Sequence, residues 1–306
     1  MIDKVKVPFS LAGRLSKMLP ADREQLSGYA FLLPLLFFIS ALILLPVLGT
    51  FLDSLRRDLP YLPSKFVGLE NYLAIFRDDG FWDSVRFTTL FVAVSVPLEV
   101  ILGLIIALLL NETFPGRTAL RATVLIPWAI PAAVSGRIFE LIYNYSFGVA
   151  NYFTQLLGGG QVNWLGTDLG AFAAVVIADV WKTTPFAAII LLAGLATIDP
   201  DLYRQAQVDR ANFMQRFLKV TLPLLKPVLI VTLLFRTVDA LRVFDVIFVL
   251  TGGGPGGSTN AMSLFAYTYY AAGDFGYGAA VSVLLFVVAL GFSLAYIKMA
   301  RLGEEL

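Results

Sequence analysis

Four charges stand in an otherwise apolar stretch near the C-terminal end of the chain, and they are the first place where it could do chemistry. They alternate in sign at intervals of three: Arg236, Asp239, Arg242 and Asp245. Neighbours three apart on a helix can form ion pairs. Charges in a helix long enough to cross a membrane face protein or water rather than lipid. Two interpretations follow. The row is a salt-bridged scaffold, or it lines a path for a polar solute that Asp239, Arg242 and Phe244 contact.

A second polar group interrupts the fourth apolar run. Lys182 follows Asp179 by three positions, so these two side chains can pair. Trp181 offers a face for stacking and Thr184 offers a hydroxyl, while Pro185 removes a hydrogen bond from the helix ladder. Hydroxyls, an aromatic face and a broken helix suit a cavity for a polyol. Trp181 and Thr184 therefore join the candidates, and ordinary helix packing is the alternative.

Covalent chemistry is not indicated by the composition. The chain of 306 residues has no Cys and no His, which removes thiolate nucleophiles, the usual metal ligands and the commonest general base. The formal net charge of +1 gives no reason to expect a nucleic acid partner. A glycine-rich run at 251–257 lacks a following Lys-Ser or Lys-Thr, so it is not a phosphate-binding loop. We expect no catalytic residue, no metal site and no cofactor bound by this chain.

The elements that position these residues are predicted to be membrane-spanning helices. The chain is 58% hydrophobic, with a mean hydropathy of +0.78, so we predict an all-α, polytopic membrane protein. A spanning helix needs about 20 mostly apolar residues. Six stretches qualify: 28–52, 87–110, 122–143, 170–196, 224–249 and 277–298. The first is too long for a signal-peptide core, so we expect it to be retained.

Polar residues within these spans carry further expectations. Glu99 in the second span is expected to face a buried structural partner, with a role in binding substrate or protons as the alternative. Pro127 and Pro131 predict a kinked or broken third helix beside a cavity. Arg137 and Glu140 are three apart near the end of that span, and we expect them to form an ion pair.

The distribution of Lys and Arg predicts the orientation. With the N-terminus inside, the inner segments hold fourteen such residues and the outer segments hold four, all within residues 53–83. The positive-inside rule therefore places both termini in the cytoplasm. Residues 53–83 are expected to be compact with a short helix. Residues 144–169 contain Trp164 and Tyr152, which suit the outer membrane interface. The leading residues 1–27 are predicted to form a basic amphipathic segment, with a loosely ordered tail as the alternative, before a membrane domain at 28–306.

A polar island at residues 199–223 separates the fourth and fifth spans. Asp199 and Pro200 predict a helix start, and we expect that helix to end near Val208. Asn212 with Gln215 predicts a capping box that opens a second short helix. The pair should expose an apolar stripe that a partner protein covers. Three basic residues of the pair are expected in water: Arg210, Arg216 and Lys219.

This island resembles the cytoplasmic coupling motif of permeases in binding-protein-dependent ABC importers. The general form of that motif is Glu-Ala-Ala, two residues, Asp-Gly-Ala, and later Phe and Leu-Pro. Six positions match at the expected spacing: Ala206, Asp209, Ala211, Phe217, Leu222 and Pro223. The chain also resembles the carbohydrate-uptake branch at Asn71-Tyr72, Ile126-Pro127, Trp181 with Pro185-Phe186, Leu192 to Leu195, and Phe244-Asp245 followed by 250–255. The strings at 181–186 and 236–245 look most like those of permeases for trehalose and related disaccharides or glucosides.

The resemblance implies a type I ABC importer permease fold with six transmembrane helices and a coupling helix pair at about 197–223. Two copies of a separate ATPase would bind ATP and Mg²⁺ and dock on the coupling residues. These residues are Arg204, Ala206, Asp209, Arg210, Ala211, Phe213 and Phe217. A second homologous permease would complete the pore, and an extracytoplasmic sugar-binding protein would deliver the sugar. The resemblance also implies location in the inner membrane of a bacterium or an archaeon.

The island departs from the family motif at three positions. Arg204 and Gln205 replace the first two residues, and Arg210 replaces the glycine. A left-handed turn at Arg210 would cost about 1 kcal/mol or more, unless the turn differs. The competing interpretation is an ion-coupled secondary transporter, in which four carboxylates carry cations or protons: Glu99, Asp179, Asp239 and Asp245. A membrane enzyme is the third and weakest interpretation, because no recognisable nucleophile is present.

Overall fold

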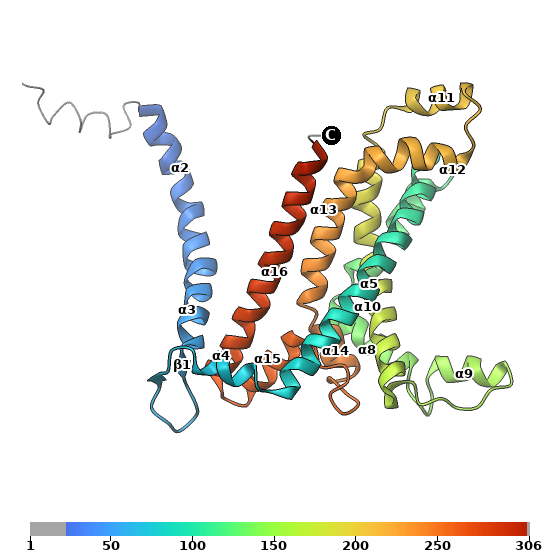
Figure 1. Ribbon diagram of the computed structural model, residues 1–306. Coiled ribbons are helices and arrows are strands. Elements are labelled where there is room, and N and C mark those ends of the chain that lie inside the picture. Colours follow the sequence, from blue (N-terminus) through green and yellow to red (C-terminus); the bar gives the residue numbers. More distant parts are fainter. Residues whose placement is uncertain (1–22, 305–306) are drawn as a thin grey trace, which may run out of the picture. The chain divides into compact units, whose positions relative to one another are not determined.

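The computed structural model describes residues 23–304, and this part of the chain is almost entirely α-helical (Figure 1). Side chains are described for residues 31–300. Most of the predicted amphipathic segment at 1–27 lies outside the described residues. The chain divides into two compact units, residues 1–52 and residues 53–306.

The first unit contains one long apolar helix. It is built from α2 (Arg23–Ile39), a π-helical turn η1 (Ser40–Leu44) and α3 (Leu45–Ser54), whose last residues belong to the second unit. Over Phe31–Ser54 the mean hydropathy reaches 2.8, and none of the most apolar window is buried. At 24 residues this stretch is long enough to cross a bilayer. It corresponds to the first predicted span.

The second unit holds the remaining helices and one small strand pair. Its elements are β1 (Arg56–Arg57), β2 (Lys65–Phe66), α4 (Glu70–Ile75), α5 (Asp79–Asn111), α6 (Arg117–Val124), α7 (Ile126–Ala129), α8 (Ala132–Ile142), α9 (Val149–Leu156), η2 (Trp164–Gly166), α10 (Asp168–Leu195), α11 (Pro200–Val208), α12 (Phe213–Arg216), η3 (Phe217–Thr221), α13 (Leu222–Leu241), α14 (Asp245–Leu250), α15 (Met262–Ala271) and α16 (Phe275–Glu304). Within the described residues, five helices are long and apolar enough to cross a membrane, or six if one bent pair counts as a span.

Helices α5 and α10 pack against each other along much of their length. At Gly103 a Cβ would lie 2.9 Å from the Cβ of Ala187, so glycine permits this close approach. Buried apolar residues from several helices flank the contact: Phe91, Val175 and Ile247 in one cluster, and Ala107, Leu191 and Leu225 in another. The α5–α10 pair therefore forms the frame on which the polar residues of both helices are held.

The third predicted span is broken, as its prolines indicated. Helices α6 and α7 run up to Ala129, and α8 begins at Ala132 after a bend of 89°. Pro131 is the residue just before α8, and its extended backbone ends the preceding helix. The predicted ion pair between Arg137 and Glu140 forms on α8.

The fifth predicted span ends earlier than expected. Helix α13 stops at Leu241, and three residues with non-helical backbone separate it from α14. The prediction of a continuous helix to residue 249 was wrong, because hydrophobic periodicity does not register a break inside an apolar run. This break brings Arg242 and Phe244 onto a loop instead of onto a helix face.

The segment between the first two long helices is compact and contains the expected short helix, α4. Strands β1 and β2 pair antiparallel, with Arg56 opposite Phe66. Asn71 on α4 donates hydrogen bonds to the carbonyls of Ser54 and Arg56, each at 2.8 Å. These bonds fix the short helix to the strand pair.

Asp78 joins three helices at the end of the second unit where α4, α14 and α15 lie (Figure 1). Its carboxylate caps α5 by accepting from the Gly80 N–H at 2.9 Å. It also accepts hydrogen bonds from the hydroxyls of Tyr277 at 2.7 Å and Tyr269 at 3.1 Å. Burial raises the pKa of Asp78, but the hydrogen bonds from Tyr277, Tyr269 and Gly80 outweigh this effect and leave the pKa below its ordinary value.

A pH dependence follows from this lowered pKa. The folded state favours ionised Asp78, so its contribution to stability is present above the unfolded pKa near about 4 and is lost as pH falls through the lower folded value. Asp78→Asn should lower the unfolding free energy by about 1–2 kcal/mol at neutral pH and flatten the acid limb of the stability curve. Unfolding of the detergent-purified protein between about pH 7 and pH 3 measures this. Asp83→Asn, at an exposed carboxylate on the same helix, is the control and should leave the curve unchanged.

Candidate functional site

Arg236 is the centre of a buried charge cluster contributed by three helices. Its side chain is 2% exposed, and its Nε donates to Glu99 Oε2 on α5 at 2.5 Å. One terminal nitrogen, Nη1, bonds to Asp239 Oδ2 at 2.7 Å, and the other, Nη2, lies 3.7 Å from Asp179 Oδ2 on α10. The expected buried partner of Glu99 is thus Arg236. An isolated charge at this depth would be strongly unfavourable, so the contacts of the Arg236 guanidinium with these carboxylates are what stabilise the cluster.

The cluster extends from the interior to an open surface through Asp239. Asp239 Oδ1 accepts from Nη2 of Arg242 at 2.9 Å, and the Arg242 side chain is 72% exposed. The predicted pairing of neighbours in the alternating row is therefore confirmed for Arg236, Asp239 and Arg242. Asp245 lies across the break, at the start of α14.

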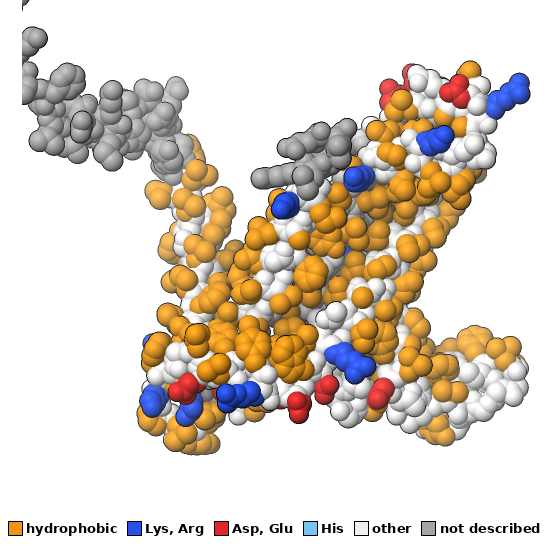
Figure 2. Space-filling view, in the orientation of Figure 1, with side chains coloured by type: hydrophobic (Ala, Val, Ile, Leu, Met, Phe, Trp, Pro, Cys, Tyr) orange, Lys and Arg blue, Asp and Glu red, His pale blue; other side chains and the backbone are white. Residues whose placement is uncertain are grey.

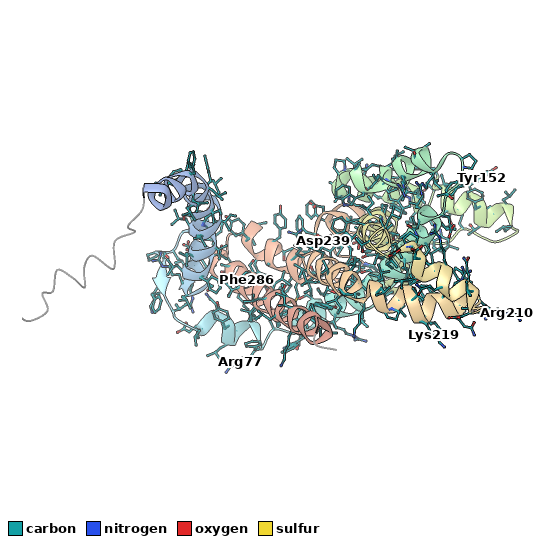
Figure 3. All side chains as sticks on the ribbon, turned by 90° about the horizontal axis from the view of Figure 1, so that it is seen from above. Arg77, Tyr152, Arg210, Lys219, Asp239 and Phe286 are labelled. Atoms are coloured by element: carbon teal, nitrogen blue, oxygen red, sulfur yellow. The ribbon has the colours of Figure 1, made fainter. Side chains whose placement is uncertain are left out.

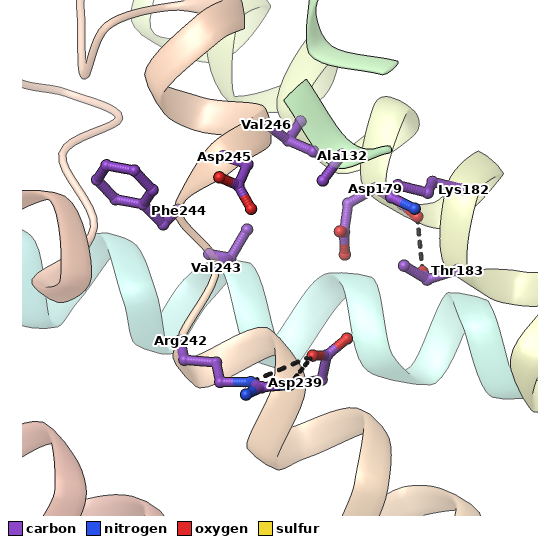
Figure 4. Close-up of a pocket in the computed structure, with 10 residues that line it drawn as sticks. All are labelled: Ala132, Asp179, Lys182, Thr183, Asp239, Arg242, Val243, Phe244, Asp245 and Val246. Atoms are coloured by element: carbon purple, nitrogen blue, oxygen red, sulfur yellow. Dashed lines mark hydrogen bonds and ion pairs between the residues drawn. The ribbon is translucent and has the colours of Figure 1, made fainter. Parts of the chain in front are cut away.

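A cavity of about 340 Å³ opens beside this chain of ion pairs (Figure 4). The polar lining comes from α10, α13, α14 and Arg242 on the loop between the last two, and Phe244 on the same loop adds an aromatic ring. All lining residues are Ala132, Asp179, Lys182, Thr183, Asp239, Arg242, Val243, Phe244, Asp245 and Val246. Three of the five residues proposed for a solute path, Asp239, Arg242 and Phe244, therefore meet in one place.

Trp181 and Thr184, the other two candidates, line a different hollow. Together with Pro127 and Pro185 they border a space of about 290 Å³ that is almost wholly apolar. The Trp181 ring packs edge-on against Phe139, with ring centroids 5.5 Å apart. Neighbouring positions on α10 thus face different spaces, because Thr183, rather than Thr184, lines the polar cavity.

Lys182 does not pair with Asp179 among the described residues. Its Nζ instead donates to the carbonyls of Ile130 at 2.8 Å and Trp128 at 3.3 Å. These carbonyls lie at the break before Pro131, where the helix ladder leaves acceptors unpaired. Lys182 thus holds the broken third span against α10. Sequence spacing identified the lysine, but the tertiary contact that fixes it was not visible from the local sequence.

The polar island lies at the opposite end of the long helices from α4 and α15, and the predicted first helix forms there as α11 (Figure 1). The prediction of a separate second short helix was wrong, because α12 continues through η3 into α13 as one helix over Phe213–Leu241. Asp199 caps α11 by accepting from the Asp201 N–H at 2.9 Å. The capping box at the start of α12 forms in both directions, with Asn212 and Gln215 bonded at 2.9 Å each way. Seen from this end, Arg210 and Lys219 point away from the other helices (Figure 3).

Arg210 occupies the turn position at which glycine is favoured. Its φ is +57°, in the left-handed region. The Ala211 N–H bonds to the Ala206 carbonyl at 2.9 Å, and the Arg210 N–H bonds to the Gln207 carbonyl at 3.0 Å. This is the hydrogen-bond pattern of a Schellman C-cap. The turn that the family glycine would favour is therefore made here by an arginine.

Arg210→Gly should stabilise the α11–α12 turn. Removing the side chain relieves a left-handed strain of about 1 kcal/mol or more, although glycine gains entropy in the unfolded chain. We expect slower hydrogen exchange at the amides of residues 209–211 and a net gain of at most about 1 kcal/mol. Arg210→Val, which is β-branched, should accelerate exchange at the same amides. Equal exchange in both variants would contradict this assignment of strain.

The remaining residues of the pair lie partly in water and partly in a hollow. Arg204 is exposed and pairs with Asp201 at 2.6 Å, and Phe213 is 65% exposed. Phe217 and Arg216 line a hollow of about 320 Å³ between the helix pair and the end of α5. The expectation that Arg216 stands in water was wrong, because it is half-buried and its Nε is inaccessible to solvent. Asp209 closes α11 as its C-cap residue.

Comparison with known proteins identifies relatives of this chain. Residues 99–302 match the family model described as the binding-protein-dependent transport system inner membrane component. The chain is 56% identical to the trehalose/maltose transport system permease protein MalF of Thermococcus litoralis over 284 residues, which covers 92% of this chain and 96% of that protein. It is 40% identical to the trehalose transport system permease protein SugA of Mycobacterium tuberculosis over 249 residues, covering 80% of this chain and 79% of that protein.

A solved structure gives the same architecture. A chain of a bacterial alginate ABC transporter, crystallised with an alginate pentasaccharide-bound periplasmic protein, superposes with a TM-score of 0.80. The alignment covers 91% of this chain and 95% of that chain at 24% sequence identity. At this identity the likeness concerns the fold. It agrees with the predicted type I ABC importer permease architecture.

Proposed function

Because this chain belongs to the family of binding-protein-dependent transport system inner membrane components, we propose that it forms half of the membrane path through which an ATP-driven importer carries a disaccharide or glucoside such as trehalose or maltose. A multi-pass permease of the inner membrane follows from membership in this family. The sugar class rests on the relatives, which are permeases for trehalose and maltose.

The polar cavity beside Asp239 supports this proposal most directly. The hydroxyls of a neutral sugar both donate and accept hydrogen bonds. Such a sugar therefore suits a cavity lined by carboxylates, a guanidinium group and the hydroxyl of Thr183. Asp239 and Arg242 would hydrogen-bond to those hydroxyls, while Phe244 would stack on an apolar face of a pyranose ring. Trp181 and Thr184 would contribute from the neighbouring hollow, where the aromatic face is more exposed than the hydroxyl.

Energy would enter through the α11–α12 pair. Its apolar residue Phe213 is exposed, as a docking contact requires. We propose that the seven coupling residues, from Arg204 to Phe217, sit against a cytoplasmic ATPase subunit. ATP and Mg²⁺ would bind to that subunit, present in two copies, and hydrolysis would take place there. Within residues 23–304 no group of three or more acidic side chains is arranged to hold a metal ion.

The same proposal fixes the orientation and the other partners. The end that carries α11 and α12 would face the cytoplasm together with both termini, and the end that carries α4, α9 and α15 would face outward. A second, homologous permease would complete the pore, and a sugar-binding protein would dock on the outer end. Closure of the ATPase dimer would move the helix pair as a lever and expose the cavity alternately to the two sides.

Subunit counting tests this proposal. The tagged chain is purified from its native membrane in mild detergent, and the intact complex is weighed by mass spectrometry. We expect two ATPase copies and one further permease with each copy of this chain. Recovery of the chain alone or as a homo-oligomer, in several detergents, would overturn the proposal and favour an ion-coupled secondary transporter.

A further inference from the structure

Helix α9 presents an apolar stripe to its surroundings. Four residues at positions i, i+3, i+4 and i+7 share one face of this helix, which is the pattern of an amphipathic helix. They are Val149, Tyr152, Phe153 and Leu156, and their exposed fractions lie between 52% and 67%. In water this stripe would be unfavourably hydrated, since a helix normally turns such a face toward a core or an apolar phase.

Asn151 anchors the opposite face and fixes the direction of the stripe. It is 3% exposed. Its Nδ2 donates to the carbonyls of Tyr145 at 2.9 Å and Val162 at 3.0 Å. Its Oδ1 accepts from the Val162 N–H at 3.0 Å and from Nε1 of Trp164 at 3.1 Å. The side chain of Asn151 is thus fully satisfied, so α9 cannot roll its stripe inward without breaking four hydrogen bonds.

The position of α9 suits a bilayer interface. It projects to the side of the helices that it connects, and its axis runs across the direction of α5, α10 and α13 (Figures 1 and 3). It lies at the level where α5 and α10 begin (Figure 1). Hydrophobic side chains cover the edge of this projection that faces the apolar length of the long helices (Figure 2).

The lack of charge around α9 and its apolar neighbours indicate that lipid, rather than a protein, covers the apolar stripe. No charged residue occurs between Glu140 and Asp168, although water-facing loops of a membrane protein usually carry several. Exposed apolar side chains also occur on the helices before and after α9 in the chain, at Leu141 on α8 and Leu169 on α10. Tyr152 and Phe153 are aromatic, as in the belt at a membrane interface.

We propose that α9 is an in-plane helix whose apolar stripe inserts into the lipid leaflet at the end of the molecule away from α11 and α12. The hydrogen bonds of Asn151 would hold the helix at the headgroup level. Because α9 follows α8 in the chain, insertion of α9 would also restrain the broken third span relative to the bilayer. Only the name of that leaflet, the outer one, rests on the proposed orientation.

Spin labelling in a bilayer tests the insertion. The chain has no Cys, so single cysteines can be introduced without removing any. The complete transporter carrying Leu156→Cys is labelled and placed in nanodiscs of phosphatidylethanolamine and phosphatidylglycerol. Collision with oxygen, which concentrates in lipid, should exceed collision with a water-soluble nickel reagent. Gln155→Cys, next in sequence but off the stripe, is the matched control and should show the reverse.

Two results would overturn the proposal. The first is that labels at positions 155 and 156 in nanodiscs both collide more with the nickel reagent than with oxygen, and that a label at Phe153→Cys does the same. The second is protection of position 156 that appears only when the sugar-binding protein is added, which would assign the stripe to protein docking. Because the readout is accessibility rather than uptake, failure here leaves the proposed transport function untouched, and loss of transport leaves this result interpretable.

Discussion

Replacing Arg236 by Met is expected to lower the free energy of unfolding by about 3–5 kcal/mol, because the substitution removes one partner of a buried ion pair and leaves the other charged. Glu99 is 0% exposed and bonds to Arg236 Nε at 2.5 Å, so it would lose its counter-charge in the interior. Asp179 and Asp239 would lose the same neighbour. Unfolding of the purified protein in detergent, followed by heat or denaturant, measures the loss.

Two further variants make this expectation specific. Arg242→Met removes a guanidinium that pairs with the same Asp239 but is 72% exposed, so the cost should stay below about 1 kcal/mol. The double substitution Glu99→Leu with Arg236→Met replaces the buried pair by apolar groups and should recover the part of the loss that comes from unpaired Glu99, while Asp179 and Asp239 still lack Arg236. If Arg236→Met were as stable as Arg242→Met, the buried cluster would not hold α5 to α13.

Replacing Phe213 by Asp is expected to abolish ATP-dependent uptake while leaving the fold intact. The side chain is 65% exposed on α12, so the chain itself should lose no more than about 0.5 kcal/mol of stability. A buried aromatic anchor at an interface carries about 2 kcal/mol or more, which corresponds to roughly 30-fold weaker binding of the ATPase. Co-purification of the ATPase with the tagged permease measures assembly, and uptake by proteoliposomes measures transport.

The control for this variant is an equally exposed phenylalanine at the other end of the long helices. Phe66 on β2 is 70% exposed, and Phe66→Asp should keep the ATPase bound at wild-type levels. Normal assembly and uptake with Phe213→Asp would remove this residue from the coupling contact. Loss of assembly with both variants would indicate a general effect of a new surface charge.

The helical class, the apolar helices and the caps of the polar island were predictable because their signals are local. Asp199, Asn212 and Gln215 each satisfy backbone groups within three residues, so sequence spacing suffices. Pro131 likewise breaks its own helix. The left-handed turn at Arg210 was not predicted from the sequence, since arginine does not favour that conformation and the motif left open whether the turn would differ.

Contacts between distant segments were not predictable in the same way. Glu99 and Arg236 are 137 positions apart, and only the packing of α5 against α13 brings them together. Lys182 was noticed for its spacing from Asp179, yet its partners are carbonyls more than 50 residues earlier. The end of α13 was missed because the same pattern, apolar residues with a charge at every third position, continues across the break before Asp245, so no local signal marks the helix end.

The most direct test of the transport account is the energy source of sugar uptake. The complete complex is reconstituted into liposomes with its binding protein, and uptake of labelled trehalose is followed with ATP on the ATPase side. We predict uptake that requires ATP and persists when ionophores collapse the proton and sodium gradients. Uptake that ignores ATP and stops with the gradients would contradict the account and would make Glu99, Asp179, Asp239 and Asp245 candidates for ion carriers.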